Sequence, residues 1–364
     1  MARRGKGIYR RKDGRWEGRY LQEGKYKSVY GHSYSEAKAK LESCTTNQEV
    51  LVGKPISTKG QAVLWSAICA DWIDRKKLCL KQSSHAQYSC IMRRHILPYW
   101  GRQNVNELTA TQVNGFIKAL SASLSTKTVR DILNVLLQVV RFAEKKHGVH
   151  IDLEEIARPK AQQGYLPVLS PDEQRRLSVY LRGNPSNINV GVLLLLYTGI
   201  RIGELCALQW ADVDLNAQAI SVTKTIQRIA DLDPTTKAKT KLIIDTPKSR
   251  SSTRLVPIPS FLLGLLSELQ GNPKSYLLTG ESRIMEPRLF QTKFKKALQS
   301  AKVAETNAHA LRHTFATRAI EQNIDIKSLS EILGHSAVKF TLERYVHSSA
   351  ELKRSGMERL AVYL

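Results

Sequence analysis

The feature that most restricts the fold is a nearly unbroken apolar run over residues 190 to 197, followed by Thr198-Gly199-Ile200-Arg201. A run without a polar face is typical of a helix that is buried on all sides. The glycine after it allows the backbone of another segment to approach closely. The run therefore predicts a core that surrounds one helix, with the Arg201 side chain emerging where the chain leaves this core.

Four more polar residues stand out in the same part of the chain. His309 and Arg312 are one helical turn apart and so share a face, His335 follows a Leu-Gly pair that would end a helix, and Tyr345 comes ten residues later. Arginines pair bidentately with phosphate oxygens, and tyrosine offers an oxygen nucleophile. If these four residues and Arg201 converge in space, they fit attack on a phosphodiester without a metal.

Each of these residues also has a purely structural alternative. Arg201 lies three residues before Glu204, so the two could form a buried structural pair, or Glu204 could hold the guanidinium ready for a ligand. The pattern His-x-x-Arg is common by chance, and a lone tyrosine such as Tyr345 is most often a core residue. The conjunction of the five residues, rather than any one of them, favours the functional interpretation.

The charge of the chain fits a polyanionic partner. There are 56 lysines and arginines against 32 aspartates and glutamates in 364 residues, a formal net charge of +24. Such a balance favours nucleic acid, although charge alone also fits a ribosomal or membrane-surface protein. No apolar run approaches the length of about 20 residues that spans a membrane, and the basic start lacks the apolar stretch of a signal peptide. We therefore expect a soluble, intracellular protein without contact to a membrane.

The cysteines give no sign of a disulfide framework or a metal site. They are five in number and none forms a Cys-x-x-Cys pair; they are Cys44, Cys69, Cys79, Cys90 and Cys206. We expect reduced thiols, and neither a metal nor any other cofactor.

The first 52 residues predict a small basic domain. Strands are expected over 7 to 11, 15 to 22 and 25 to 30, joined by Asp-Gly and Glu-Gly turns, and a helix over 36 to 50 capped by Ser33 and Ser35. Strand alternation places Arg15, Glu17 and Arg19 on one face, opposite Trp16, Gly18 and Tyr20. Arg15 and Arg19 are therefore candidate DNA contacts; the alternative is a solvated basic hairpin that keeps an edge strand soluble.

Two further units follow polar linkers. Residues 60 to 158 predict four helices: one that begins near Trp65, one over 84 to 97 that stops at Pro98, one after Thr109 and one over 126 to 146. The fourth has a buried stripe of Val129, Ile132, Leu133, Leu136, Leu137 and Val140. Its Lys127 and Arg130 are candidate phosphate contacts, or else ordinary charges on a helical bundle.

Residues 165 to 364 predict the largest unit, of class α+β. A helix begins at Ser170-Pro-Asp-Glu173, strands cover 219 to 226, 241 to 246 and 253 to 258, and helices follow to the end of the chain. The predicted fold class is thus a multidomain protein, mainly α with small β-sheets: a three-stranded sheet plus helix, a four-helix domain and this α+β domain.

The last 200 residues resemble the tyrosine recombinase (phage integrase) family. The resemblance rests on Thr-Gly-x-Arg201-x-x-Glu204, His309-x-x-Arg312, Gly-His335 and the tyrosine ten residues later, in that order. It implies that both arginines hold the scissile phosphate, that both histidines bond its oxygens or help to transfer protons, and that Tyr345 forms a 3′-phosphotyrosyl link.

The family also uses a lysine between two strands as general acid toward the leaving 5′-oxygen. Residues 246 to 259, Thr-Pro-Lys-Ser-Arg-Ser-Ser-Thr-Arg-Leu-Val-Pro-Ile-Pro, match this hairpin and indicate Lys248. Lys239 and Lys241 precede the second strand and are weaker candidates. Lys224, in the first strand, is weaker still.

The resemblance extends upstream, where residues 60 to 158 look like a helical, SAM-like core-binding domain and residues 1 to 52 like an arm-type DNA-binding domain. It implies the integrase of a conjugative transposon or phage, acting in DNA integration and excision as a homotetramer on core and arm sites of double-stranded DNA. Recombination would pass through a Holliday junction, with an excisionase and a host DNA-bending protein as further partners. The segment after Tyr345 is expected to dock on a neighbouring protomer. The alternatives are an inactive DNA-binding regulator with the same fold and a hydrolytic nuclease.

Overall fold

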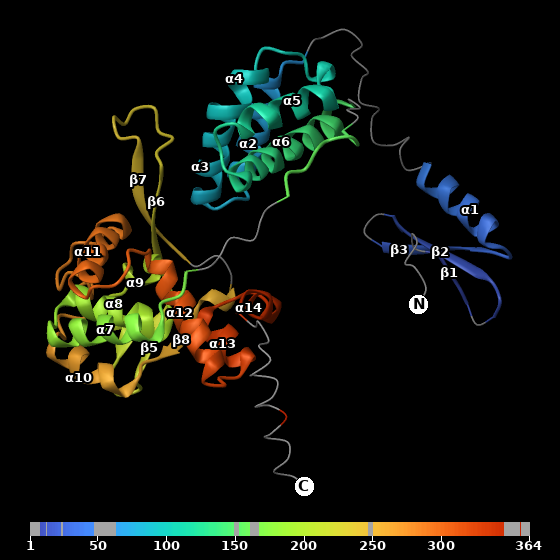
Figure 1. Ribbon diagram of the computed structural model, residues 1–364. Helices are drawn as coiled ribbons and strands as arrows, with labels where there is room; N and C mark the ends of the chain where they lie inside the picture. The colour runs from blue at the N-terminus through green and yellow to red at the C-terminus, as the bar shows by residue number, and fades with distance from the viewer. Residues whose placement is uncertain are drawn as a thin grey trace. The chain divides into compact units, whose positions relative to one another are not determined.

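The structure, a computed structural model, describes residues 8–11, 13–22, 25–46, 63–148, 153–160, 167–246, 250–345 and 357. Contacts within the chain divide it into two compact units. The first comprises residues 1 to 72 and 94 to 158, and the second residues 73 to 93 and 159 to 364. Each is described by itself (Figure 1). The boundaries of the three predicted domains stay a prediction.

The first unit opens with a three-stranded antiparallel sheet in the order β1(Ile8–Arg10), β2(Trp16–Gln22), β3(Lys25–Gly31). Helix α1(Tyr34–Thr46) covers one face, where a Cβ on Gly18 would lie 3.4 Å from Leu41. The Ser33 hydroxyl accepts from the Glu36 amide at 3.1 Å and caps this helix. The predicted strands and their alternation are confirmed, whereas Ser35 lies inside α1 rather than ahead of it. The predicted helix end at 47 to 50 lies outside the described residues.

Helices continue the chain, and their bounds are α2(Trp65–Lys77), α3(Gln82–Ile91), α4(Leu97–Trp100), α5(Ala110–Ser121) and α6(Thr126–His147), with a 3-10 turn at Val105–Glu107. The expectation that the second helix stops at Pro98 was wrong. A π-helical turn, Met92–Ile96, leads directly into α4, which has Pro98 in its first turn. Proline is tolerated there because the first N–H groups of a helix have no intrahelical acceptor.

Aromatic side chains and the stripe of α6 build the core of the first unit. The Trp100 ring lies 6.4 Å from that of Trp65 and 4.4 Å from that of Phe116, measured between centroids. On α6 the predicted stripe is buried except for Leu137, which is only half-buried. Val135 and Val139 are buried as well. The apolar face of this helix is therefore wider than the predicted stripe.

The second unit is built around α8(Asn187–Thr198), which packs against α7, α10, α11 and α12. Residues 192 to 196 of α8 are at most 1% exposed, which confirms the predicted core helix. Helix α7 begins with the expected capping box of Ser170 and Glu173. Besides α3, which falls in residues 73 to 93, the other helices of this unit are α7(Pro171–Gly183), α9(Ile202–Leu205), α10(Ser260–Glu268), α11(Pro287–Ser300), α12(Ala308–Glu321), α13(Ile326–Leu333) and α14(Val338–Tyr345), with 3-10 turns at Trp210–Asp212 and Arg250–Ser252.

The strands of this unit are β4(Val213–Asp214), β5(Ala219–Val222), β6(Thr225–Ala230), β7(Thr240–Asp245) and β8(Arg254–Pro257). The single strand predicted over 219 to 226 was wrong, because the chain is interrupted at Thr223-Lys224. Strand β5 pairs with β4 and β8, whereas β6 pairs with β7. The two pairings form one long hairpin. Its first half consists of β5 and β6, and its second half consists of β7 and β8 with an interruption between them. Its outer part, the ribbon of β6 and β7, extends from the body formed by the helices (Figure 1).

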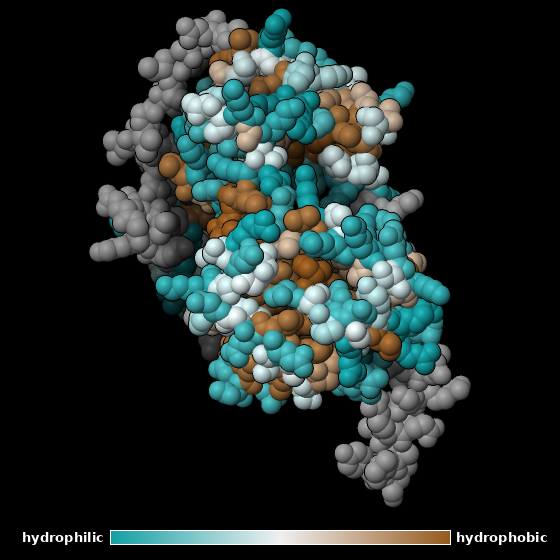
Figure 2. Space-filling model, turned by 90° about the vertical axis from the view of Figure 1, so that its left-hand side faces the viewer, coloured by the Kyte–Doolittle hydropathy of each residue, from teal (hydrophilic) through white to brown (hydrophobic). Residues whose placement is uncertain are grey.

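The molecular surface is mixed in polarity. The face shown in Figure 2 is mostly hydrophilic, with several separate hydrophobic areas. In the part of the chain that the structure describes, no helix combines the length and apolar character that a membrane span requires.

Candidate active site

Arg201 lies between the end of α8 and the start of α9, and it makes two hydrogen bonds to Glu204. The Glu204 carboxylate accepts from the Arg201 amide at 2.9 Å and from Nη1 at 2.7 Å. Glu204 is 2% exposed, whereas the Arg201 side chain is 34% exposed. The carboxylate is therefore buried behind a guanidinium that still reaches solvent, as a preorganised ligand-binding arginine requires.

A second arginine that the sequence did not assign, Arg254 on β8, holds the same carboxylate. Its Nη2 donates to Glu204 Oε2 at 3.0 Å and its Nε to the Ile332 carbonyl at 2.5 Å, while its side chain is 7% exposed. Burial raises the pKa of the Glu204 carboxyl, but the charges and hydrogen bonds of Arg254 and Arg201 outweigh burial and leave this pKa below its ordinary value. Glu204 thus stays ionised between two arginines.

Glu204→Gln is expected to lower the free energy of unfolding at pH 7 by about 3 kcal/mol, because the neutral amide leaves Arg254 buried without a counter-charge. A lowered pKa in the folded state means that the stabilisation is present above the ordinary value of 4.5 and is lost as pH falls through the lower, folded pKa. The difference in the free energy of unfolding between wild type and variant should therefore become smaller below pH 4.5. Urea unfolding at a series of pH values from 7 downward measures this difference.

Glu321→Gln is the matched control, since the Glu321 side chain is 43% exposed in its pair with Arg318. This variant should lower the free energy of unfolding by less than about 1 kcal/mol. Equal losses for the two variants would contradict the role assigned to burial of Glu204.

Arg312, on α12, is 5% exposed and reaches the ends of two other helices. Its Nη1 donates to the Gly199 carbonyl after α8, and its Nη2 to the Leu333 carbonyl at the end of α13, both at 2.7 Å. Arg201 Nη2 donates to the next carbonyl, that of Gly334, at 3.2 Å. Two guanidinium groups that are far apart in the sequence therefore converge on one turn.

Gly334 gives this turn its shape. It has φ +64° and ends α13, as the sequence predicted, and a Cβ in its place would lie 3.0 Å from Arg254 Nη1. The left-handed conformation favours glycine, and the close arginine leaves little room for a side chain. The next residue, His335, thereby points its ring toward Arg312, with 3.1 Å between His335 Nε2 and Arg312 Nη2.

The other ring nitrogen of His335 binds a residue that the sequence did not single out. His335 Nδ1 lies 2.8 Å from Thr341 Oγ1, and Thr341 is 0% exposed on α14. The same helix ends at Tyr345, of which the structure describes only the backbone. Tyr345 therefore lies one helical turn beyond Thr341, on a helix that packs against α12 and α13.

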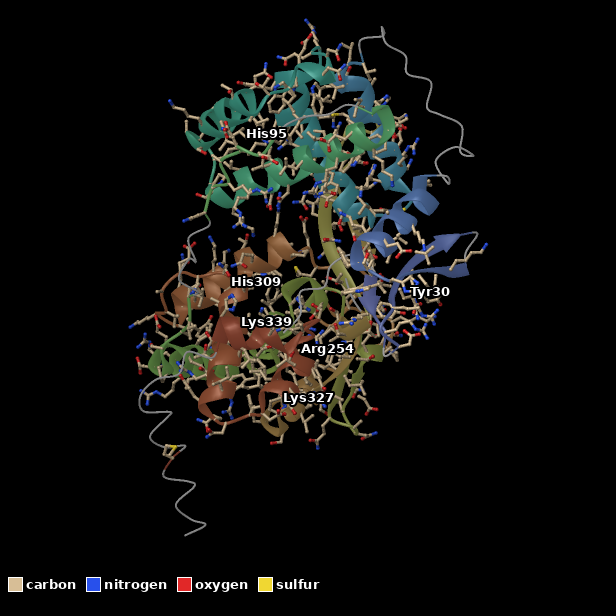
Figure 3. All side chains as sticks on the ribbon, turned by 90° about the vertical axis from the view of Figure 1, so that its right-hand side faces the viewer. Tyr30, His95, Arg254, His309, Lys327 and Lys339 are labelled. Carbon is tan, nitrogen blue, oxygen red and sulfur yellow. The ribbon has the colours of Figure 1, made fainter. Side chains whose placement is uncertain are left out.

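The remaining predicted residues differ in how much the structure says of them. His309, labelled in Figure 3, is exposed on the first turn of α12, one turn before Arg312. Its ring centroid lies 6.4 Å from that of the buried His313. Lys248 lies outside the described residues, in the interruption between β7 and β8, so its role stays a prediction.

Two of the competing lysines have partners elsewhere. Lys224 lies between β5 and β6 rather than in a strand, and its Nζ is 3.0 Å from Gln209 Oε1. Lys241 lies in β7 and pairs with Asp231 at 3.2 Å. Both ammonium groups are thus held by polar side chains that are not among the predicted site residues.

The predicted Arg19 lies on the face of the N-terminal sheet that α1 does not cover. Glu17 lies on the same face but is buried beneath the arginine side chain. Glu17 is 2% exposed and accepts from Arg19 Nε at 2.9 Å and from the Ser28 hydroxyl at 2.7 Å. These bonds lower the pKa of Glu17 to about 2. Arg15 instead binds Asp13 at 2.8 Å. Both arginine side chains are more than half exposed, so the face is positively charged toward solvent.

Lys127 and Arg130 are both exposed on α6, and their contact with phosphate stays a prediction. Among the residues that the structure describes, no group of three or more His, Cys, Asp or Glu side chains is arranged to hold a metal ion. Cys69, Cys79, Cys90 and Cys206 are free thiols, and burial raises the pKa of Cys69 to about 12.

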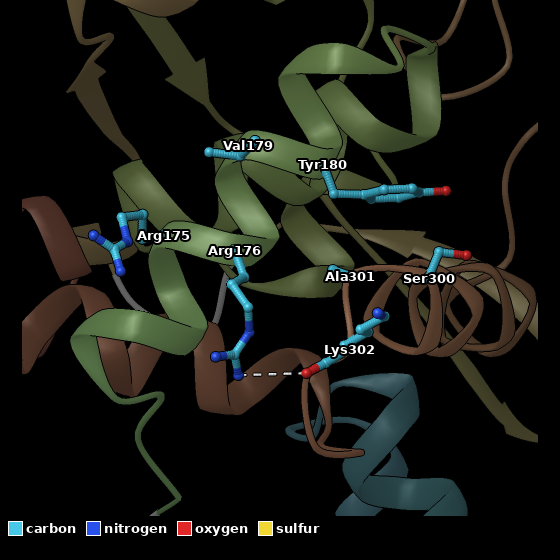
Figure 4. A pocket seen from close by; sticks show the side chains of 7 residues that line it. All are labelled: Arg175, Arg176, Val179, Tyr180, Ser300, Ala301 and Lys302. Atoms are coloured by element: carbon cyan, nitrogen blue, oxygen red, sulfur yellow. Dashed lines mark hydrogen bonds between the residues drawn. The ribbon is translucent and has the colours of Figure 1, made fainter.

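A shallow pocket lies between α7 and the end of α11, where Arg176 Nη2 donates to the Lys302 carbonyl (Figure 4). This pocket includes none of the predicted site residues.

Comparison with known proteins identifies the family of the chain. Residues 167 to 351 match the phage integrase family, and residues 66 to 121 match the N-terminal SAM-like domain of phage integrases. The chain belongs to the phage integrase family. The predicted family is confirmed, and with it the enzyme class, a tyrosine-type site-specific DNA recombinase.

Relatives and solved structures extend the similarity along the chain. The chain is 26% identical to a tyrosine recombinase XerC-like protein of Caldanaerobacter subterraneus subsp. tengcongensis, over 92% of this chain and 91% of that one. It is 22% identical to the ICEBs1 integrase of Bacillus subtilis, over 79% and 80%. The fold matches the Tn1549 transposon integrase in complex with transposon right end DNA (TM-score 0.66, 21% identity, 82% and 100% covered). It also matches a lambda integrase tetramer bound to a Holliday junction (TM-score 0.58, 16% identity, 94% and 97% covered).

Proposed function

We propose that this protein is the integrase of a mobile genetic element and that it cleaves and rejoins DNA through Tyr345. The observation that carries the proposal is the convergence of Arg201 and Arg312 on the turn that precedes His335. Two guanidinium groups at one place match the charge of a phosphodiester and of its pentacoordinate transition state. The same turn leads into α14, which carries the tyrosine.

In the proposed reaction the Tyr345 hydroxyl gives up its proton to water, its oxygen attacks the phosphorus, and the bond from phosphorus to the 5′-oxygen breaks. The product is a 3′-phosphotyrosine and a 5′-hydroxyl, whose proton comes from Lys248. His309 and His335 donate hydrogen bonds to the nonbridging oxygens. Because the phosphoester conserves the energy of the broken bond, rejoining needs neither ATP nor a metal.

The proposal is tested by incubating the wild-type protein with a nicked duplex of the element's own ends in the presence of EDTA. A covalent adduct, mapped by mass spectrometry to the peptide that contains Tyr345, is expected. Tight binding without an adduct would instead indicate the inactive regulator. Product ends without an adduct would indicate the nuclease.

We further propose that residues 60 to 158 clamp the core site, that residues 1 to 52 read arm sites, and that residues 165 to 364 form the catalytic domain. Four protomers would join two duplexes and exchange strands through a Holliday junction, with the segment after Tyr345 docking on a neighbour. The Tn1549 and lambda integrases were solved on DNA, the latter also as a tetramer, which supports this arrangement. An excisionase and a host bending protein would set the direction. Sedimentation of the protein on a synthetic junction tests the tetramer.

Arg19→Ala is expected to weaken binding to an arm site and to reduce the salt dependence of the affinity by about one counterion, because its exposed guanidinium would contact a phosphate or base. Fluorescence anisotropy at several salt concentrations measures both effects. Lys38→Ala, on α1, is the control, since Lys38 lies on the helix that covers the other face of the sheet. Arm-site affinities that fall equally for both variants would contradict a specific role of the sheet.

A further inference from the structure

His335 makes hydrogen bonds through both of its ring nitrogens. Nε2 lies 3.1 Å from Arg312 Nη2, and Nδ1 lies 2.8 Å from Thr341 Oγ1. A guanidinium has only N–H donors, so Nε2 must face it with a lone pair. The ring proton therefore sits on Nδ1, which donates it to the hydroxyl of Thr341.

Thr341 connects this histidine to the helix of the nucleophile. It is 0% exposed on α14, and the helix reaches Tyr345 one turn later. Leaving a buried hydroxyl without its hydrogen-bond partner destabilises the fold. The hydrogen bond to His335 therefore links α14 to the turn whose carbonyls accept from Arg201 and Arg312. A shift of α14 would have to break this bond or carry His335 with it.

We propose that Thr341 is a positioning residue for DNA cleavage: its hydroxyl orients His335 and ties the helix of Tyr345 to the phosphate-binding arginines. The inference rests on the proposed function. A phosphate oxygen between Arg312 and His335 calls for an N–H at Nε2, whereas the DNA-free ring carries its proton on Nδ1. Exchange with water moves that proton from Nδ1 to Nε2. The hydroxyl then turns from acceptor to donor, so Thr341 satisfies His335 in both states.

The test compares Thr341→Val, which keeps the shape and removes the hydroxyl, with Thr341→Ser, which keeps the hydroxyl. Single-turnover cleavage of a nicked duplex at saturating DNA should be about tenfold slower for the valine variant, as loss of one hydrogen bond predicts. The serine variant should cleave within about twofold of wild type, and the Kd for DNA should be unchanged in both.

Two further comparisons separate positioning from general destabilisation. In a His335→Ala background, Thr341→Val should slow cleavage no further, because its partner is already gone. Thr314→Val is the matched control: Thr314 is also 0% exposed, and its hydroxyl binds the Leu169 amide and the Ala310 carbonyl. It should lower stability but leave the cleavage rate of the folded protein unchanged.

The proposal is overturned if Thr341→Val cleaves at the wild-type rate, if Thr341→Ser is as slow as the valine variant, or if the valine change slows the His335→Ala protein by the same factor. Nitrogen-15 spectra of histidine-labelled, DNA-free wild type give a test that needs no variant at position 341. They should show His335 protonated on Nδ1, and a proton on Nε2 would also overturn the proposal. A wild-type protein that forms no adduct would instead defeat the proposed function.

Discussion

Tyr345→Phe is expected to abolish the covalent adduct with DNA and to slow strand cleavage by at least about 10⁴-fold, because it removes the atom that forms the new bond in the proposed reaction. The affinity for a single core site should stay within about twofold of wild type, since phosphate contacts rather than the nucleophile dominate binding. Denaturing electrophoresis of the protein with a nicked, labelled duplex measures the adduct, and anisotropy measures the affinity.

Tyr197→Phe is the control for the loss of a tyrosine hydroxyl elsewhere in the same unit. The Tyr197 hydroxyl lies 2.9 Å from the Ser178 hydroxyl, so its removal costs a hydrogen bond but no reacting group. This variant should form the adduct at the wild-type rate. An adduct that persists in Tyr345→Phe would show that another residue is the nucleophile and would contradict the proposed site.

Elements that depend on local signals could be predicted from the sequence. The capping box at Ser170, the apolar run of α8 and the glycine after α13 each fix a helix boundary through neighbouring residues. Pro98 shows the limit of such rules. A proline both ends helices and begins them, and the residues next to Pro98 do not decide which of the two occurs.

The partner of each side chain could not be predicted. Arg254 meets Glu204 because the hairpin folds against α9, and Thr341 meets His335 because the turn between α13 and α14 places the ring against the new helix. A motif shows which residue types are present, but not which carbonyl or carboxylate each will bind. Glu17 is a similar case. Strand alternation predicted the face of the sheet on which it lies, but not its burial, which depends on hydrogen bonds from Arg19 in the same strand and from Ser28 in the neighbouring strand.

Arg312→Lys is expected to slow cleavage by about 10³-fold and to lower the free energy of unfolding by about 2 to 4 kcal/mol. The guanidinium donates at once to the carbonyls of Gly199 and Leu333, both at 2.7 Å, and faces His335. A single ammonium cannot span both carbonyls and also reach a phosphate, so one buried acceptor loses its donor and the transition state loses a bidentate partner. Single-turnover cleavage at saturating DNA and urea unfolding measure the two effects separately.

Arg318→Lys, on the same helix, separates catalysis from packing. Arg318 Nη2 donates to the Leu169 carbonyl at 2.7 Å and Nη1 pairs with Glu321, so lysine there also loses guanidinium bonds. This variant should lose stability but cleave at the wild-type rate when folded, because Arg318 has no contact with the turn before His335 among those described. If Arg312→Lys cleaved within tenfold of wild type, or if both variants slowed cleavage equally, the convergence of Arg312 and Arg201 would serve the fold rather than the phosphate.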